Sequence, residues 1–193
     1  MNFLAHAYLS FNDPDILVGN IIADFVKGKQ IDSYPNQIKR GIIVHREIDN
    51  FTDNFPLNIE TKSVFSKLVG KYNASFLDVS FDYFLANDIS RQPLGGWQKF
   101  AENCYKAIEE RAIVLPAKFC SMFMYMKSEN WLYNYQYKWM IQRSFERLQR
   151  RAKFLSEDIN VFTIFEENQI EIQNCYDIFF PKLEEVTKKL IET

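Results

Sequence analysis

The sequence predicts an all-α fold, arranged as one compact domain of eight or nine helices over residues 1–193. Only six glycines and six prolines occur in 193 residues, and each proline stands where a helix can start or stop. No segment alternates apolar and polar residues as a half-buried strand does. Hydrophobic residues make up 47% of the chain and charged residues 25%, which is typical of a globular protein with a full core.

The predicted helices of the first half cover residues 14–26, 35–51, 56–70 and 75–87. Asp13 and Pro14 supply the N-cap and first turn of the first helix. Pro35 and Pro56 open the next two, and Gly70 closes the third. Residues 91–96 contain one proline and two glycines, so we predict a loop there.

The predicted helices of the second half cover residues 97–114, 117–127, 130–155 and 160–190. We expect a break in the last of them near Pro181, because proline removes a backbone donor from a helix interior. No internal repeat, low-complexity tract or linker divides the chain, which indicates a single domain.

Charge and cysteine usage exclude several classes of protein. Lys and Arg number 23 and Asp and Glu 25, giving a net charge of −2 that argues against a generally basic nucleic-acid binder. Three cysteines without a CxxC or Cys/His cluster favour neither a disulfide framework nor a zinc site, so we expect a reducing cytoplasm. The longest apolar stretch, residues 119–126, is too short to span a membrane, and the first residues lack the basic region of a leader.

Three predicted helices carry short polar side chains at helical spacing on otherwise apolar surfaces. These stripes are Asn20, Asp24 and Lys27; His45, Asp49 and Asp53; and Asp78 and Asp82. Each stripe alone is compatible with the solvated face of an amphipathic helix. Solvated faces usually mix Lys and Glu, however, whereas Asp, Asn and His are poor helix-interior residues. Three such stripes together favour a shared site.

The five carboxylates of these stripes need a counter-charge if they converge away from water, because an unpaired buried charge costs several kcal/mol. The main nearby cations are Lys27 and Arg46. A divalent metal is therefore the simplest partner, and carboxylate and imidazole donors without thiolate favour Mn²⁺ or Mg²⁺ over structural zinc.

Both histidines of the chain lie in its first quarter, beside these stripes. His45 stands four residues before Asp49, on the same helical face, and is a predicted metal ligand. His6 remains open between a second ligand, a general acid or base and a structural residue. A core histidine satisfied by its neighbours is the alternative interpretation for each.

Several segments around these residues resemble one known family. They are residues 1–6, 19–28, 45–49, 51–53, 78–79 and 84–85, with Asp82, and a weaker likeness continues through residues 128–132 and 150–151. Together they resemble the bacterial acyl carrier protein phosphodiesterase family, also called acyl carrier protein hydrolase.

The resemblance implies hydrolysis of the phosphodiester between 4′-phosphopantetheine and a serine of holo-acyl carrier protein, with Mn²⁺ or another divalent cation. It also implies a distant relation to the helical HD-type phosphohydrolases. Arg46 follows His45 where that superfamily has aspartate, so its ligand set does not transfer, and Asp49 is the candidate replacement. Members often have histidine where this chain has Tyr8 and Tyr83, so neither tyrosine is counted as a ligand.

The predicted metal ligands are Asp24, His45, Asp49 and Asp78. Asp82 is expected to be a further ligand or a water-orienting base, and His6 to protonate the departing serine oxygen. Arg46 is the predicted phosphate clamp, because its planar fork matches phosphate oxygens; a salt bridge to a helix-face carboxylate is the alternative. Asn20 and Lys27 are expected to orient substrate or ligands.

Because acyl carrier proteins are acidic, docking calls for a positive surface, and Arg143, Arg147, Arg150 and Arg151 form a basic run on a late helix. We predict substrate contacts at Arg147 and Arg150; a solvated helix face is the alternative.

The aromatic residues between 131 and 139 are interpreted as packing groups rather than a pantetheine channel. Two rival functions remain open: a metal-dependent hydrolase of a small phosphoester, and a non-catalytic protein that binds acyl carrier protein. The oligomeric state also remains open.

Overall fold

The computed structural model describes residues 1–153, 155–156 and 158–192, and within these ranges it consists of helices joined by short loops. The α-helices are α1 (Phe3–Tyr8), α2 (Pro14–Ile22), α3 (Asn36–Asn54), α4 (Pro56–Thr61), α5 (Ser63–Val69), α6 (Asn73–Asn87), α7 (Gly96–Glu109), α8 (Ala117–Ser128), α9 (Trp131–Asn134), α10 (Lys138–Arg151), α11 (Val161–Glu167) and α12 (Gln169–Glu192). The 3-10 helices are η1 (Ala23–Phe25), η2 (Gly28–Ser33), η3 (Gly70–Tyr72), η4 (Ile89–Arg91) and η5 (Ala112–Val114). The predicted all-α class is confirmed.

The α-helices outnumber the eight or nine expected because three predicted helices are each divided in two. The region 56–70 divides at Lys62 into α4 and α5, residues 130–155 divide into α9 and α10, and residues 160–190 divide at Asn168 into α11 and α12. Pro181 lies inside α12 without ending it. Phe180 and Leu183 on either side of this proline are fully buried, and their packing stabilises the helix through the lost backbone hydrogen bond.

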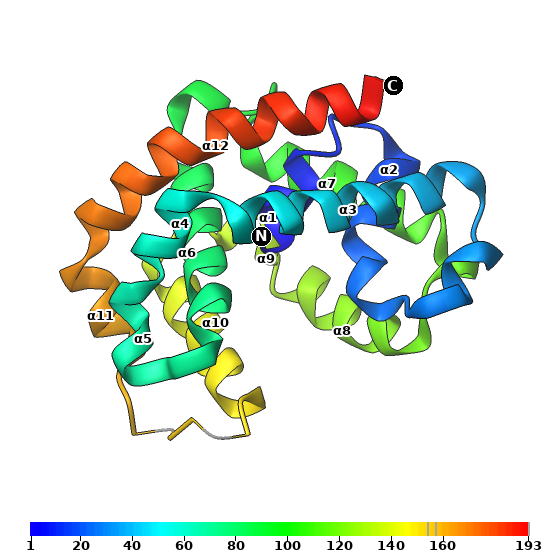
Figure 1. Cartoon of the computed structure of the whole chain (residues 1–193). Coiled ribbons are helices and arrows are strands. Elements are labelled where there is room, and N and C mark those ends of the chain that lie inside the picture. The colour runs from blue at the N-terminus through cyan, green and yellow to red at the C-terminus, as the bar shows by residue number, and fades with distance from the viewer. Residues whose placement is uncertain (154, 157, 193) are drawn as a thin grey trace.

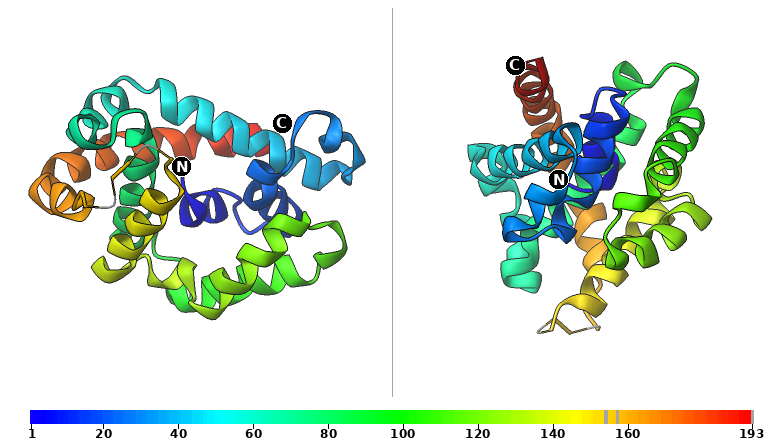
Figure 2. Two further views of the ribbon diagram at one scale, coloured as in Figure 1. Left: turned by 90° about the horizontal axis from the view of Figure 1, so that it is seen from below. Right: turned by 90° about the vertical axis from the view of Figure 1, so that its right-hand side faces the viewer.

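Helix α1, which the periodicity did not predict, lies at the centre of the molecule. Figure 2, left, shows it enclosed by the helices that follow it in the chain. Leu4 and Ala5 are completely buried, and α1 packs against both α2 and α6. At six residues it is too short to be stable by itself, so tertiary packing must hold it.

Helices α2 and α3 form the most extensive helix pair, and α12 runs beside α3 (Figure 1). Helix α2 begins as expected: the Asp13 carboxylate accepts hydrogen bonds from the backbone N–H groups of Asp15 and Ile16 at 2.9 Å, and Pro14 occupies the first turn. Helix α3 is 19 residues long and begins directly after Pro35, so its predicted start is confirmed.

The backbones of α2 and α3 touch at two glycines. A Cβ added to Gly19 would lie 2.0 Å from the carbonyl oxygen of Ile38, and one added to Gly41 would lie 2.3 Å from that of Ile16. Both distances are far below van der Waals contact. Glycine at positions 19 and 41 is therefore required for the close approach of the two helices.

We predict that Gly41→Ala lowers the free energy of unfolding by about 1–3 kcal/mol, because the new methyl group must push α2 away from α3. Urea unfolding followed by circular dichroism measures the change. Glu47→Ala, at an exposed position of α3, serves as the control and should leave the unfolding midpoint nearly unchanged. Equal midpoints for the two variants would contradict the close contact.

Candidate functional site

Two histidines and one aspartate from α1 and α3 meet at the centre of the molecule. The Nε2 atom of His6 lies 3.3 Å from Oδ1 of Asp49, and the Nε2 atom of His45 lies 3.2 Å from Oδ2 of the same carboxylate. One ligand atom from each of the three residues lies within 4.8 Å of the other two. We call His6, His45 and Asp49 the histidine–aspartate trio.

The orientation of His45 is set by the backbone of α2. Its Nδ1 lies 2.7 Å from the carbonyl oxygen of Asn20. A carbonyl oxygen only accepts, so Nδ1 carries the hydrogen and donates it. The Nε2 atom then faces Asp49 and, at 3.4 Å, Oδ1 of Asp24. This arrangement, a backbone carbonyl behind an imidazole, is typical of metal-ligating histidines.

The imidazole ring of His6 packs against that of His45. The rings of His6 and His45 stack with their centroids 4.0 Å apart and their planes inclined by 18°. Among the described residues, neither ring nitrogen of His6 has a hydrogen-bond partner, nor does Nε2 of His45. Buried polar atoms without partners are uncommon and call for an explanation such as a missing ion.

The two imidazoles differ in their proton affinity. Burial, together with repulsion from His45, lowers the pKa of His6 to about 4. Burial would also lower the pKa of His45, but the carboxylates of Asp24 and Asp49 outweigh it and raise that pKa to about 9. For Asp49, burial is outweighed by the two imidazoles and the Met1 ammonium, so its pKa lies below the usual range. At neutral pH the trio therefore holds one neutral and one protonated imidazole.

The Met1 ammonium group lies between Asp49 and Asp78. It is 3.0 Å from Oδ1 of Asp49 and 3.4 Å from Oδ1 of Asp78. Burial would lower the pKa of this ammonium, but the two carboxylates outweigh it and raise the pKa to about 11. The Met1 ammonium therefore bridges Asp78, a predicted metal ligand, and Asp49 of the trio.

Asp82 is bound to the start of α1. Its Oδ2 accepts a hydrogen bond from the Leu4 N–H at 2.8 Å, and its Oδ1 accepts one from the Ala5 N–H at 3.0 Å. Burial raises the pKa of Asp82 to about 7 although both N–H groups stabilise the charged form. With each oxygen engaged by the backbone, Asp82 positions α1 and hence His6. The expected ligand or base role at the reacting atoms finds no support in this geometry.

Asp24 lies at the solvent side of the trio because α2 does not continue as far as predicted. The α-helix ends at Ile22 and tightens into η1, so the helical spacing of Asn20, Asp24 and Lys27 is lost. Asn20 is completely buried, whereas Asp24 is exposed and near His45. Lys27 is exposed beyond the end of η1.

Asn20 links the two histidine-bearing segments. Its side-chain amide donates hydrogen bonds to the carbonyl oxygen of His6 at 2.9 Å and to Oγ of Ser10 at 3.2 Å. Its own carbonyl oxygen accepts the bond from His45. Asn20 therefore fixes the positions of both histidine-bearing segments, and its role in orienting substrate or ligands stays a prediction.

Arg46, the predicted phosphate clamp, faces another direction. One residue after His45, it is rotated by about 100° around α3, and its Nη2 donates to the carbonyl oxygen of Val26 at 3.4 Å. The arginine that shares a cavity with Asp24 and Asp49 is Arg151, at the end of α10. Sequence reasoning placed Arg151 only in the basic run, because its distance from the aspartates along the chain hides the contact.

The cavity beside the trio has a volume of about 410 Å³. It is lined by Met1, Asn2, Phe3, Asp24, Asp49, Tyr72, Ser75, Asp78, Val79, Leu148, Arg151 and Ala152. The lining thus combines three carboxylates with one guanidinium, that of Arg151. The guanidinium could donate hydrogen bonds to an anion bound in this cavity. The carboxylates would repel the same anion unless a cation neutralised them.

The remaining predicted substrate residues belong to α10 and lie away from the trio. Arg147 donates to Oε2 of Glu129, and its guanidinium lies 4.6 Å from the centre of the Trp131 ring. Arg150 is exposed on the same helix. Both line a second cavity, which is described below.

Tyr8 and Tyr83 both point away from the trio. The Tyr8 hydroxyl donates to Oε1 of Glu184 at 2.9 Å, and its ring packs near Trp97. Tyr83 packs edge-on against Phe165, at 5.6 Å between centroids. The two departures from the family pattern therefore leave the donor atoms of the trio unchanged.

Comparison with known proteins places these features in a family. The model of the family described as "Acyl carrier protein phosphodiesterase" matches residues 1–183. A protein of that name from Yersinia pestis is 30% identical, over 95% of both chains, and one from Pectobacterium atrosepticum is 29% identical over 97% of this chain and 98% of its own. A third, from Escherichia coli O157:H7, is 31% identical over 95% of both chains.

No solved structure matches the chain, so the expected relation to HD-type phosphohydrolases stays a prediction. None of the helices in the described ranges combines the length and the apolar character needed to cross a lipid bilayer.

We predict that Asp82→Ala destabilises the protein, because it leaves the buried N–H groups of Leu4 and Ala5 without an acceptor. The expected loss is about 1–3 kcal/mol for each orphaned N–H, measured by urea unfolding. Asp82→Asn retains one acceptor oxygen and should lose less. Asp53→Ala, at an exposed position of α3, is the control, and a loss for Asp82→Ala no larger than for this control would contradict the role of Asp82.

Proposed function

The chain belongs to the acyl carrier protein phosphodiesterase family, and from this premise we propose that it hydrolyses holo-acyl carrier protein. The bond cleaved is the phosphodiester between 4′-phosphopantetheine and the carrier serine, and the products are the apo-protein and free 4′-phosphopantetheine. The observation that carries the proposal is the meeting of His6, His45 and Asp49 beside a cavity that also holds a guanidinium.

The trio fits a divalent cation. The Nε2 atoms of His6 and His45 are buried without hydrogen-bond partners in the described part of the chain, and both face Asp49. Two imidazole nitrogens and carboxylate oxygens, with no thiolate, suit a first-row transition ion such as Mn²⁺ better than Mg²⁺. Asp24 offers a further carboxylate beside His45. We propose these four residues as the ligands, with Asp78 near them through the Met1 ammonium.

A bound divalent cation supplies Lewis-acid stabilisation of charge on the phosphate oxygens. The protein contributes the rest. Arg151 lines the same cavity as the carboxylates, and its planar fork can donate two hydrogen bonds to the phosphate. Asp24, exposed at the cavity wall, has two carboxylate oxygens, so while one binds the cation the other can accept a hydrogen bond from the attacking water.

His6 is better suited to binding the cation than to donating a proton. Its pKa of about 4, caused by burial and by His45, leaves the imidazole neutral at physiological pH. A neutral imidazole has a lone pair for a metal but no acidic proton for the departing serine oxygen. We therefore propose His6 as a ligand, in place of the general acid considered from the sequence.

The carrier protein is expected to dock beside the cavity, over the exposed arginines of α10 such as Arg150. With a carrier protein as the substrate and free thiols at Cys104, Cys120 and Cys175, we place the reaction in the reducing cytoplasm.

We predict that the purified protein, with Mn²⁺, removes 4′-phosphopantetheine from holo-acyl carrier protein, and that His45→Ala lowers turnover about 100-fold or more. Intact-protein mass spectrometry of the carrier protein measures both. Asp53→Ala should retain the turnover of the unchanged protein. Chelator treatment should abolish turnover and added Mn²⁺ should restore it.

Retention of the prosthetic group by the carrier protein under all these conditions would contradict the proposed function. Hydrolysis of a small phosphoester in the same preparation would then favour the first rival function. Tight binding of the carrier protein without hydrolysis would favour the second.

We predict that Arg150→Glu raises KM for holo-acyl carrier protein about two- to tenfold and weakens its salt dependence, because the variant repels an acidic partner. Steady-state kinetics at two ionic strengths measure the change. Lys188→Glu, an equal charge change at an exposed position of α12, is the control. A KM that responds equally to both reversals would show that net charge, rather than this surface, governs docking.

A further inference from the structure

A second cavity adjoins the one beside the trio. Its volume is about 450 Å³, within the ~300–1,000 Å³ typical of small-molecule sites. The two cavities share the residues Asn2, Phe3, Val79, Leu148 and Arg151 in their walls. A ligand held at the trio can therefore extend past the start of α1 into the second cavity, which we call the aromatic cavity.

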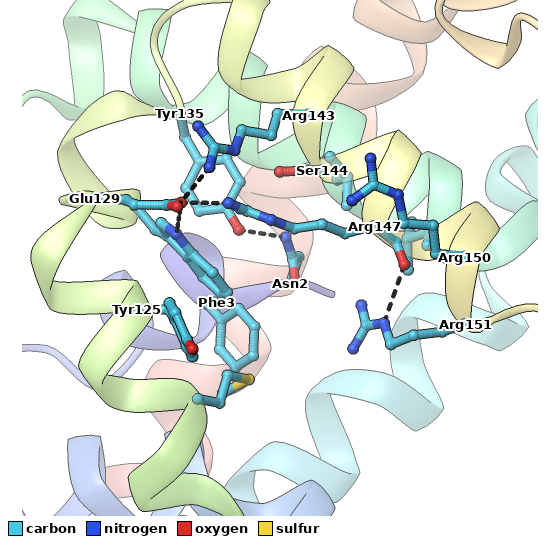
Figure 3. A pocket seen from close by; sticks show the side chains of 14 residues that line it. Asn2, Phe3, Tyr125, Glu129, Tyr135, Arg143, Ser144, Arg147, Arg150 and Arg151 are labelled. Atoms are coloured by element: carbon cyan, nitrogen blue, oxygen red, sulfur yellow. Dashed lines mark hydrogen bonds and ion pairs between the residues drawn. The ribbon is translucent and has the colours of Figure 1, made fainter.

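The walls of the aromatic cavity differ in character. Figure 3 shows Phe3 and Tyr125 on one side and Arg150 and Arg151 on the other. Trp131 and Met122 add further apolar surface to the lining. This combination of apolar wall and a few polar groups suits a neutral ligand with both methyl and amide groups.

The wall is held rigid by paired charges. The Trp131 indole Nε1 donates to Oε2 of Glu129 at 2.8 Å, and Arg143 and Arg147 both donate to the same carboxylate. Arg147 also stacks over the Trp131 ring. The fixed aromatic ring needs no rearrangement before a ligand binds, which lowers the entropic cost of binding.

We propose that the aromatic cavity binds the pantetheine arm of the substrate while the phosphodiester lies between the trio and Arg151. This inference rests on the proposed function and names the part of the substrate that each cavity takes. The arm continues from the phosphate through a dimethyl-bearing carbon and two amides to a thiol. The arm is uncharged and partly apolar, which matches the apolar side chains and few polar groups that line the cavity. Trp131 belongs to the hydrophobic core, as the sequence predicts, and it also lines the cavity.

The junction of the two cavities supports this assignment. Arg151 lines both, so a guanidinium is available where the phosphate and the arm meet. The acidic carrier protein would then cover the exposed rim formed by Arg150, and its serine would enter beside Asp24.

Met122→Trp tests the proposal, because the larger side chain fills the aromatic cavity from a partly exposed position of α8. We expect the variant to bind free 4′-phosphopantetheine about tenfold more weakly, equivalent to about 1.4 kcal/mol, in isothermal titration calorimetry. Its affinity for apo-acyl carrier protein should be unchanged. Met124→Trp is the matched control: it lies on the same helix, is 69% exposed and does not line the cavity.

Tyr125→Ala provides a second, independent variant, since Tyr125 is 66% exposed and its truncation leaves the core intact. It removes part of the cavity wall and should also weaken 4′-phosphopantetheine binding selectively. Affinities for 4′-phosphopantetheine that are the same in the unchanged protein, Met122→Trp and Tyr125→Ala would overturn the inference.

The binding measurement separates this inference from the proposed function. If the protein cleaves holo-acyl carrier protein but the cavity variants bind the free product normally, the inference fails and the function stands. If the protein binds 4′-phosphopantetheine in the aromatic cavity but never cleaves the carrier protein, the inference stands and the function fails.

Discussion

The contact between the backbones of α2 and α3 is the constraint on which the site depends. Gly19 and Gly41 leave no room for a side chain between the two helices. Asn20 directly follows the first glycine, and His45 lies one turn after the second. The 2.7 Å hydrogen bond from His45 to the Asn20 carbonyl oxygen is therefore a consequence of the close approach. With wider helix spacing, the imidazole would have no fixed tautomer and no fixed direction.

A second constraint brings His6 to the same place. Helix α1 is short and buried, and the Asp82 carboxylate holds its first N–H groups. The Asn20 side chain binds the carbonyl oxygen of His6, so α1, α2 and α6 are linked around the trio. Leaving any of these buried polar groups without a partner is costly, and all of them are paired together only in this arrangement of the three helices. The same bonds that stabilise the centre of the fold therefore position the ligand atoms.

The charges of the site are the reason for proposing a bound cation. Asp24, Asp49 and Asp78 line one cavity, and the cationic groups in direct contact with them include the Met1 ammonium and protonated His45. Carboxylates in such surroundings lose hydration and must be compensated locally. In the proposed function, a divalent ion would provide that compensation, and its binding would require the proton of His45 to leave. Arg151, which lines the same cavity, would then add a second positive charge for a phosphate.

The sequence by itself determined the helical class, most helix boundaries that depend on Pro or Gly, and the set of polar residues in which the site lies. These properties follow from local geometry and periodicity, which act over a few residues. The tertiary structure decided which of those residues meet: His6 joined His45 and Asp49, Asp82 became a support for α1, and Arg151 rather than Arg46 came to line the cavity with Asp24 and Asp49. Helix periodicity predicts which residues share a face, but the cavity that Arg151 shares with Asp24 and Asp49 brings together residues more than a hundred positions apart in the chain. No pattern within one helix records such a contact.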